Sequence, residues 1–170
     1  KNFKAMYFEK EMPIKDLARR IVSNALNIDD ETMMNASETD KALIQKQIIE
    51  QLDDEQEDVL SRLWIVPAND FDNVADMFSL IETYKPDVWV LDFITQIGLE
   101  DSKNGDFNSI VMKNAQALKK VVQTTDSFGI VLSQVVKGIT KRIDKRIVQD
   151  DIEWSGTIKH ISAYIFSTFF

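Results

Sequence analysis

The stretch Asp87-Val88-Trp89-Val90-Leu91-Asp92-Phe93 indicates the fold class of this 170-residue chain. Five of its seven residues are apolar, and Pro86 precedes it, which is typical of a strand buried on both faces of a parallel sheet. The stretch places a carboxylate, Asp92, at the strand's end. Ligands of open parallel sheets gather beyond the carboxyl ends of the strands, so Asp92 is a candidate functional acid with a metal ion as its expected partner. The alternative is that Asp92 only caps a turn.

The rest of the chain alternates between strand and helix patterns. Apolar runs predict further strands at 4–9, 63–67, 129–134 and 163–169, and helical spacing predicts helices at about 13–27, 38–52, 71–84 and 107–124. A short helix or turn is expected at 151–161, and the acidic segment 28–60 is interpreted as a solvated face. Crossovers of this length imply parallel pairing. The predicted fold class is therefore α/β, a mostly parallel sheet flanked by helices, in one domain.

Composition excludes several classes of protein and of site. The chain is 44% hydrophobic and 28% charged, as in ordinary globular proteins, and it has neither a long apolar run nor a signal peptide. No membrane partner is expected. The absence of cysteine excludes disulfides and thiolate metal sites and favours a cytoplasmic location, and the single histidine disfavours histidine-based zinc sites.

Charge is unevenly distributed along the chain. The formal net charge is −8, which disfavours a generally basic nucleic-acid binder. Residues 135–149 nevertheless hold five basic side chains against one acid, so this segment carries +4 and the remainder carries −12. A short basic segment on an acidic body predicts a local site for anions.

Polar side chains follow three of the predicted strands: Glu11, Asp92, and Ser133 with Gln134. In a parallel sheet these ends share one edge. Two carboxylates and an amide at one edge suit nucleotide hydrolysis, with Asp92 holding Mg²⁺ through water, Glu11 polarising the attacking water and Gln134 sensing the terminal phosphate. The alternative is a set of unrelated polar loop residues.

These residues resemble the ATPase domain of DnaB-type hexameric replicative helicases, which have a RecA-like fold. The family motif S-L-E-M corresponds to residues 9–12, I-D-Y-L-Q to the segment around Asp92, S-L-K-A-L-A to 117–122 and A-L-S-Q-L to 131–135. The pattern R-A-D-K-R-P-M-L-S-D-L-R-E-S-G-S-I matches 142–158 without a gap. Eight residues of that block are identical: Arg142, Asp144, Lys145, Arg146, Asp151, Ser155, Gly156 and Ile158.

The resemblance implies a role for each matched residue. Glu11 would be the catalytic glutamate, Asp92 the Mg²⁺-site acid that helps to bind ATP, and Gln134 the sensor. Lys145 and Arg146 would be finger residues that reach the ATP of a neighbouring subunit; the alternative is a solvated loop. The residues implied for DNA binding are Lys141, Arg142, Trp154 and Gly156. The implied partners are single-stranded DNA, like subunits in a hexameric ring, and a primase or helicase loader.

Two departures from the family pattern stand out. No G-x-x-x-x-G-K-[ST] loop for ATP phosphates occurs. We expect that loop before Lys1, so that the RecA-like domain of residues 1–170 is partial and incomplete at both ends. Glu153 replaces the Arg usual in the DNA loop, which would weaken phosphate contacts, and Trp154 would either stack on a base or pack against a neighbour.

Three functions are therefore weighed. The first is a helicase motor that couples ATP hydrolysis to translocation and unwinding, with a phage or mobile-element source consistent with the sequence drift. The second is a non-catalytic, helicase-derived binding or assembly module. A recombinase-like or clock-type RecA-like ATPase is the third, and the ungapped block at 142–158 argues against it.

Overall fold

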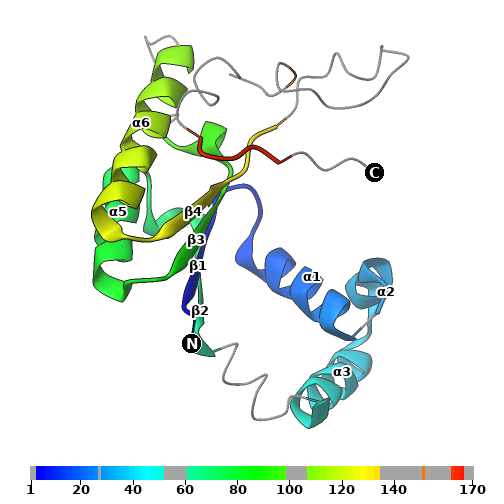
Figure 1. Cartoon of the computed structure of the whole chain (residues 1–170). Coiled ribbons are helices and arrows are strands. Elements are labelled where there is room, and N and C mark those ends of the chain that lie inside the picture. The colour runs from blue at the N-terminus through cyan, green and yellow to red at the C-terminus, as the bar shows by residue number, and fades with distance from the viewer. Residues whose placement is uncertain are drawn as a thin grey trace.

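A parallel sheet forms the centre of the molecule (Figure 1). The computed structural model describes residues 3–26, 28–51, 61–98, 107–134, 151 and 162–166. Within these residues the strands are β1 (Ala5–Glu9), β2 (Leu63–Val66), β3 (Val88–Asp92) and β4 (Phe128–Val131), in the order β2-β1-β3-β4. All three described pairings are parallel, which confirms the predicted sheet and places β3 in its interior.

Helices lie on both sides of the sheet (Figure 1). On one side are α5 (Val74–Tyr84) and α6 (Phe107–Thr125). On the other side α1 (Ile14–Leu26), α2 (Asp30–Asn35) and α3 (Glu38–Gln51) extend away from the strands. Two short 3-10 helices, η1 (Ala68–Asp70) and η2 (Ile94–Gln96), follow β2 and β3. The helix bounds agree with the sequence prediction to within a few residues.

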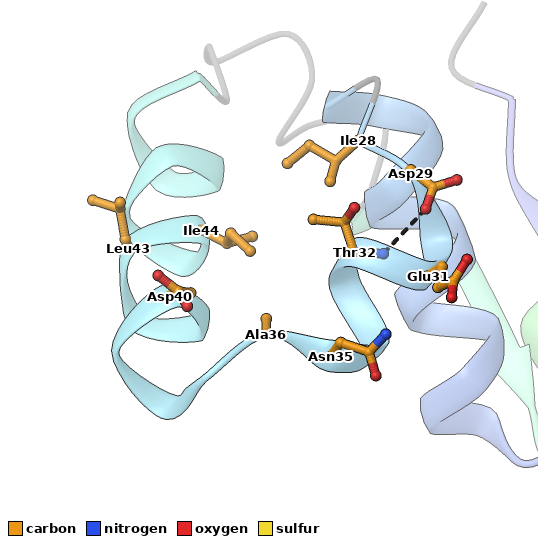
Figure 2. Close-up of a pocket in the computed structure, with 9 residues that line it drawn as sticks. All are labelled: Ile28, Asp29, Glu31, Thr32, Asn35, Ala36, Asp40, Leu43 and Ile44. Carbon is orange, nitrogen blue, oxygen red and sulfur yellow. Dashed lines mark hydrogen bonds between the residues drawn. The ribbon is translucent and has the colours of Figure 1, made fainter.

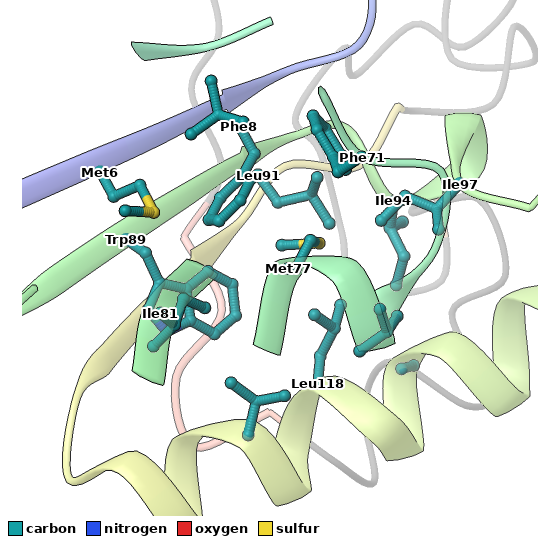
Figure 3. Close-up of a cluster of buried hydrophobic side chains, with 14 of the residues drawn as sticks. Met6, Phe8, Phe71, Met77, Ile81, Trp89, Leu91, Ile94, Ile97 and Leu118 are labelled. Carbon is teal, nitrogen blue, oxygen red and sulfur yellow. The ribbon is translucent and has the colours of Figure 1, made fainter. Parts of the chain in front are cut away.

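The core lies between the sheet and the helices α5 and α6 (Figure 3). Alternate strand residues point to opposite faces, so one side chain in two enters this layer. From the sheet come Met6, Phe8, Trp89 and Leu91, all buried. The helices supply residues at the 3.6-residue spacing that the sequence showed: Val74, Met77, Ile81, Val111, Ala115, Leu118 and Val121.

The opposite face of the sheet is less covered. Val88 and Val90 are half-buried, and in β4 Phe128 and Ile130 remain 57% and 40% exposed. The expectation that the Asp87–Phe93 stretch is buried on both faces is therefore wrong for the described structure. The reason is that an apolar run identifies both faces as apolar but does not specify what packs on each.

Trp89 fixes the contact between β3 and β4. Its indole Nε1 donates a 3.0 Å hydrogen bond to Ser127 Oγ, and its ring lies against Gly129, the register partner of Trp89. A Cβ atom built on Gly129 would come within 2.4 Å of the ring. A glycine is therefore required here because the indole occupies the space that a side chain would fill.

Local contacts define both ends of α5 and join α1 to α2. Asn73 and Asp76 form a capping box at the start of α5, and the helix ends at Lys85 in the left-handed conformation, before the buried Pro86. Arg19 of α1 binds Asp30 of α2 at 2.8 Å, which holds the pKa of Asp30 below its ordinary value. These local contacts explain why the helix boundaries follow the sequence signals.

The predicted strand at 163–169 is not formed where the structure describes it. Residues 163–166 have no strand geometry, and Tyr164 and Phe166 are exposed with their rings stacked 6.4 Å apart. A strand needs a neighbouring edge to complete its hydrogen bonds, and apolar composition alone does not supply one. Residues 167–169 and most of the helix or turn expected at 151–161 lie outside the described ranges.

Candidate functional site at the strand ends

The carboxyl ends of β1, β3 and β4 meet at one edge of the sheet. Glu9 pairs with Asp92 in register, and the backbone N–H of Lys10 donates to the Asp92 carbonyl at 3.0 Å. On the other side of β3, the Leu132 N–H donates to the Leu91 carbonyl at 3.0 Å. The structure thus places the segments that carry Glu11, Asp92 and Gln134 along one edge, as the sequence predicted.

Asp92 has a tyrosine as its described partner. The Tyr7 hydroxyl donates a 2.6 Å hydrogen bond to Asp92 Oδ2. Burial, followed by this hydrogen bond, raises the pKa of Tyr7, so the phenol keeps its proton at and above its ordinary titration range. The hydrogen bond fixes the half-buried carboxylate at one of its two oxygens. Sequence reasoning missed Tyr7, although it is the polar-tipped residue between the core residues Met6 and Phe8.

Glu11 stands on a tight turn between β1 and α1. Its side chain is exposed, while its backbone N–H donates to Glu9 Oε1 at 2.6 Å and the next N–H, of Met12, donates to the same oxygen at 2.8 Å. Pro13 then opens α1 by accepting from the N–H groups of Asp16 and Leu17. The Glu11 carboxylate is therefore accessible to solvent while its backbone is held in place.

Glu9 is a second acid that sequence reasoning did not single out. It is fully buried at the last position of β1, and its Oε2 atom has no hydrogen-bond partner among the described residues. Paired residues of parallel strands point to the same face, so Glu9 shares a face with Asp92. A usable signal was the period-two alternation, which places Glu9 two residues after Tyr7 on that face.

Lys10 has a structural role. Its ammonium donates to the carbonyls of Ala68 at 2.8 Å and Phe71 at 2.7 Å, and forms a 3.3 Å ion pair with Asp72. It also lies 4.9 Å from the centre of the Phe71 ring. Lys10 thus joins the end of β1 to the connection between β2 and α5, and its positive charge is already compensated there.

Gln134 follows the last strand rather than ending it. The predicted strand 129–134 is too long, since β4 ends at Val131. After Asp92 the chain enters η2, so in the described part of the chain β3 offers no further strand residue for β4 to pair with. One hydrogen bond still links the two segments, because the Ile94 N–H donates to the Leu132 carbonyl at 3.1 Å. Gln134 lies exposed beyond this point. Its amide is therefore at the same edge as Asp92 but on a non-strand segment.

The remaining predicted site residues cannot be placed in the site. They fall outside the residues that the structure describes: Lys141, Arg142, Lys145, Arg146, Trp154 and Gly156.

The donor set at the strand ends suits a hard cation. Carboxylate oxygens are the ligands that Mg²⁺ prefers, and Mg²⁺ in nucleotide sites is held by one or two carboxylates with water and phosphate oxygens. The described ranges contain no cluster of three or more His, Cys, Asp or Glu that could hold a metal alone. Asp92 fits a site in which one carboxylate holds the ion together with water and the phosphate oxygens of a nucleotide.

A separate hollow lies between α2 and α3, away from the strand ends (Figure 2). It has a volume of about 600 Å³ and an acidic lining. Two of its three acids have structural roles: Asp29 Oδ2 accepts from Thr32 N–H at 3.1 Å and caps α2, and Asp40 accepts from Ser37 at the start of α3. Helix capping accounts for these carboxylates, so the strand ends remain the candidate site.

No described helix is long and apolar enough to cross a membrane.

A family model and solved structures relate the chain to known proteins. Residues 1–167 match the family model of the DnaB-like helicase C terminal domain. The structure of a DnaB-like replicative helicase and its interactions with primase aligns with a TM-score of 0.74 and 18% identity, covering 94% of this chain and 38% of that one. A second solved structure, of an ATPase domain, aligns with a TM-score of 0.73 and 19% identity, covering 94% and 57%. No curated protein sequence matches. The fold class is thus confirmed as the RecA-like fold of these helicase domains.

Proposed function

Because the chain belongs to the DnaB-like helicase C-terminal domain family, we propose that the complete protein is a replicative DNA helicase. In this proposal, ATP hydrolysis at subunit interfaces drives translocation on single-stranded DNA and duplex unwinding. The chain spans 38% and 57% of the two structures it resembles, so this activity belongs to the complete protein. The observation that carries the proposal is the placement of Asp92 and the Glu11 turn at neighbouring strand ends, joined by the Lys10–Asp92 backbone hydrogen bond.

Each residue of this edge has one task in the proposal. Asp92, oriented by Tyr7, would hold the hydration shell of Mg²⁺, and Glu11 would accept a proton from a water molecule at its exposed carboxylate. Gln134 would make a polar contact with the terminal phosphate. Mg²⁺-ATP, when bound, supplies the phosphoryl group and charge neutralisation. The protein contributes orientation of the acid and of the base, which is the main requirement in phosphoryl transfer.

The basic segment completes the site from a neighbouring subunit. Lys145 and Arg146 would stabilise the phosphates across an interface of a hexameric ring, and an arginine suits that role because it stays charged and binds two oxygens. Lys141, Arg142, Trp154 and Gly156 would follow the single-stranded DNA, with a primase or helicase loader as a further partner. Apart from Lys141, which directly precedes it, these residues lie in the ungapped sequence block at 142–158, and the resemblance of that block to the helicase family supports their assignment.

The alternative of a non-catalytic module is not favoured. A module without turnover has no need of a base presented on a fixed turn. The hold of Glu9 on the Glu11 backbone and of Tyr7 on the Asp92 carboxylate supports a hydrolytic role over a purely structural one.

The test is the Glu11→Gln variant of the complete protein. Glutamine keeps the size of the side chain but cannot accept the proton, so we expect ATP turnover to fall by about 100-fold or more, while binding of a fluorescent ATP analogue stays near the unmodified level. DNA-stimulated phosphate release and analogue titration measure the two quantities. Glu82→Gln, an equivalent change at an exposed position in α5, is the control. Normal turnover in Glu11→Gln would overturn the assignment.

A further inference from the structure

The buried acid Glu9 carries an inference that rests on the proposed function. We propose that Glu9 is a positioning residue, which acts on hydrolysis by fixing the backbone turn that presents Glu11. The carboxylate is fully buried at the end of β1. Its Oε1 atom accepts from the N–H groups of both Glu11 and Met12, at 2.6 and 2.8 Å. One buried oxygen thus fixes the orientation of two successive peptide groups at the site.

The hydrogen bonds of Glu9 point to the turn as its point of action. Both side-chain hydrogen bonds described for it involve Oε1 and this turn, whereas Oε2 is buried and has no partner among the described residues. A buried N–H group that loses its acceptor has no water nearby to replace it, so the two hydrogen bonds to Oε1 are costly to break. Removing Oε1 therefore leaves the N–H groups of Glu11 and Met12 without their acceptor, and the turn is no longer held.

The neighbouring residue limits where the turn can move. Lys10 is tied through its N–H to Asp92 and through its ammonium to the carbonyls of Ala68 and Phe71. Lys10 fixes the start of the turn relative to the acid on β3, and Glu9 fixes its next two residues. The position of the Glu11 backbone relative to Asp92 is therefore set by the Lys10 backbone N–H and by the Glu9 side chain. Catalysis is sensitive to this, because a displacement of about 1 Å can cost about 100-fold in rate.

The experiment compares two variants of the complete protein. Glu9→Met has a similar length without an acceptor, whereas Glu9→Gln keeps an acceptor oxygen and removes the charge. Amide hydrogen exchange of the peptide containing Glu11 and Met12 reports on the turn without any nucleotide. We expect exchange at least about 10-fold faster in Glu9→Met and near the unmodified rate in Glu9→Gln.

ATP turnover gives the second readout. We expect kcat to fall by about 10- to 100-fold in Glu9→Met, with the KM for ATP within about 3-fold, because the turn presents the base rather than the nucleotide. Glu9→Gln should recover most of kcat. Glu82→Gln again serves as the charge control. If Glu9→Met fails to fold, Glu9→Asp replaces it, since the shorter side chain keeps the charge but withdraws the acceptor.

Three outcomes would overturn the proposal: unchanged exchange at the turn in Glu9→Met, a raised KM with unchanged kcat, or equal losses in Glu9→Met and Glu9→Gln. Unchanged exchange would show that Glu9 does not hold the turn. A raised KM with unchanged kcat would indicate a role in binding ATP. Equal losses in the two variants would indicate a requirement for the carboxyl group itself or for general stability. Failure of the proposed function gives a different result, because Glu11→Gln would then turn over normally while the exchange data still report whether Glu9 holds the turn.

Discussion

Single polar atoms at the ends of β1 and β3 determine what this site can do. Asp92 shares a 2.6 Å hydrogen bond with Tyr7, and the proton of that bond stays on the phenol because the pKa of Tyr7 is raised. The hydrogen bond gives the Asp92 carboxylate a fixed orientation at one of its two oxygens. A supporting partner that sets the direction of a ligand is common around metal-site acids, so this hydrogen bond suits the Mg²⁺ role proposed for Asp92.

The role of the Tyr7 hydroxyl can be tested with one substitution. Tyr7→Phe keeps the ring but removes the hydroxyl, so Asp92 loses its orienting hydrogen bond. We expect the Mg²⁺ concentration needed for half-maximal ATP turnover in the complete protein to rise by about 10- to 100-fold. Mg²⁺ titrations of the ATPase rate measure it. Tyr84→Phe, at an exposed ring that packs on Trp64, is the matched control. An unaltered Mg²⁺ dependence in Tyr7→Phe would show that the hydroxyl does not support the acid.

The parallel ladder between β3 and β4 contains one close side-chain contact. The Trp89 ring fills the space above Gly129, and Ser127 holds the indole N–H. This contact places the segment after β4, with Gln134, beside the end of β3. Asp92 and the segment with Gln134 are therefore brought to one edge by the packing of Trp89 against Gly129, although neither Asp92 nor Gln134 takes part in that contact.

A substitution at Gly129 tests this contact. In Gly129→Ala the new methyl group would lie 2.4 Å from the rigid Trp89 ring, so the ring or the strand must move. We expect a loss of about 1–3 kcal/mol in the free energy of unfolding, measured by chemical denaturation. The double variant with Trp89→Phe should lose less than the sum of the two single variants, because the smaller ring leaves room. Additive losses would place the strain elsewhere.

In the whole molecule, the proposed acid and base lie at one edge of the sheet, and this edge is proposed to work with a neighbouring subunit. Asp92 at the end of β3 and Glu11 on the turn after β1 belong to one chain, whereas the proposed finger residues Lys145 and Arg146 are assigned to the next subunit's site. The proposal therefore requires that one site be built from two chains in a ring.

Mixing two inactive variants tests this requirement. Glu11→Gln subunits would keep an intact finger, and Arg146→Ala subunits would keep an intact base. In a mixed ring some interfaces combine the intact base of one subunit with the intact finger of another, so the mixture should show ATPase activity that neither variant shows alone. Turnover of the separate and mixed complete proteins measures this. Activity that stays at the level of the separate variants, under conditions where subunits exchange, would contradict a finger acting across the interface.

The sequence by itself was sufficient for the parallel α/β fold and for most element positions. Apolar runs in the strands and 3.6-residue spacing in α5 and α6 reflect local geometry, so Met77 and Leu118 could be assigned to the inner helix faces, whereas only the structure showed that Trp89 and Leu91, and not Val88 and Val90, enter the core. The shared edge followed from the same patterns, because parallel strands place their carboxyl ends together. The positions of Asp92, Glu11 and Gln134 along it were found this way.

Only the tertiary structure decided which side chains hold that edge together. The partners Tyr7 and Asp92 are 85 positions apart, and Lys10 reaches carbonyls 58 and 61 positions away, so no local pattern identifies them. The same holds for the less covered face of β3 and for residues 163–166, which have strand-like composition but no strand geometry. Local sequence determines the direction in which a side chain can point, whereas its partner depends on which distant segment the fold brings beside it.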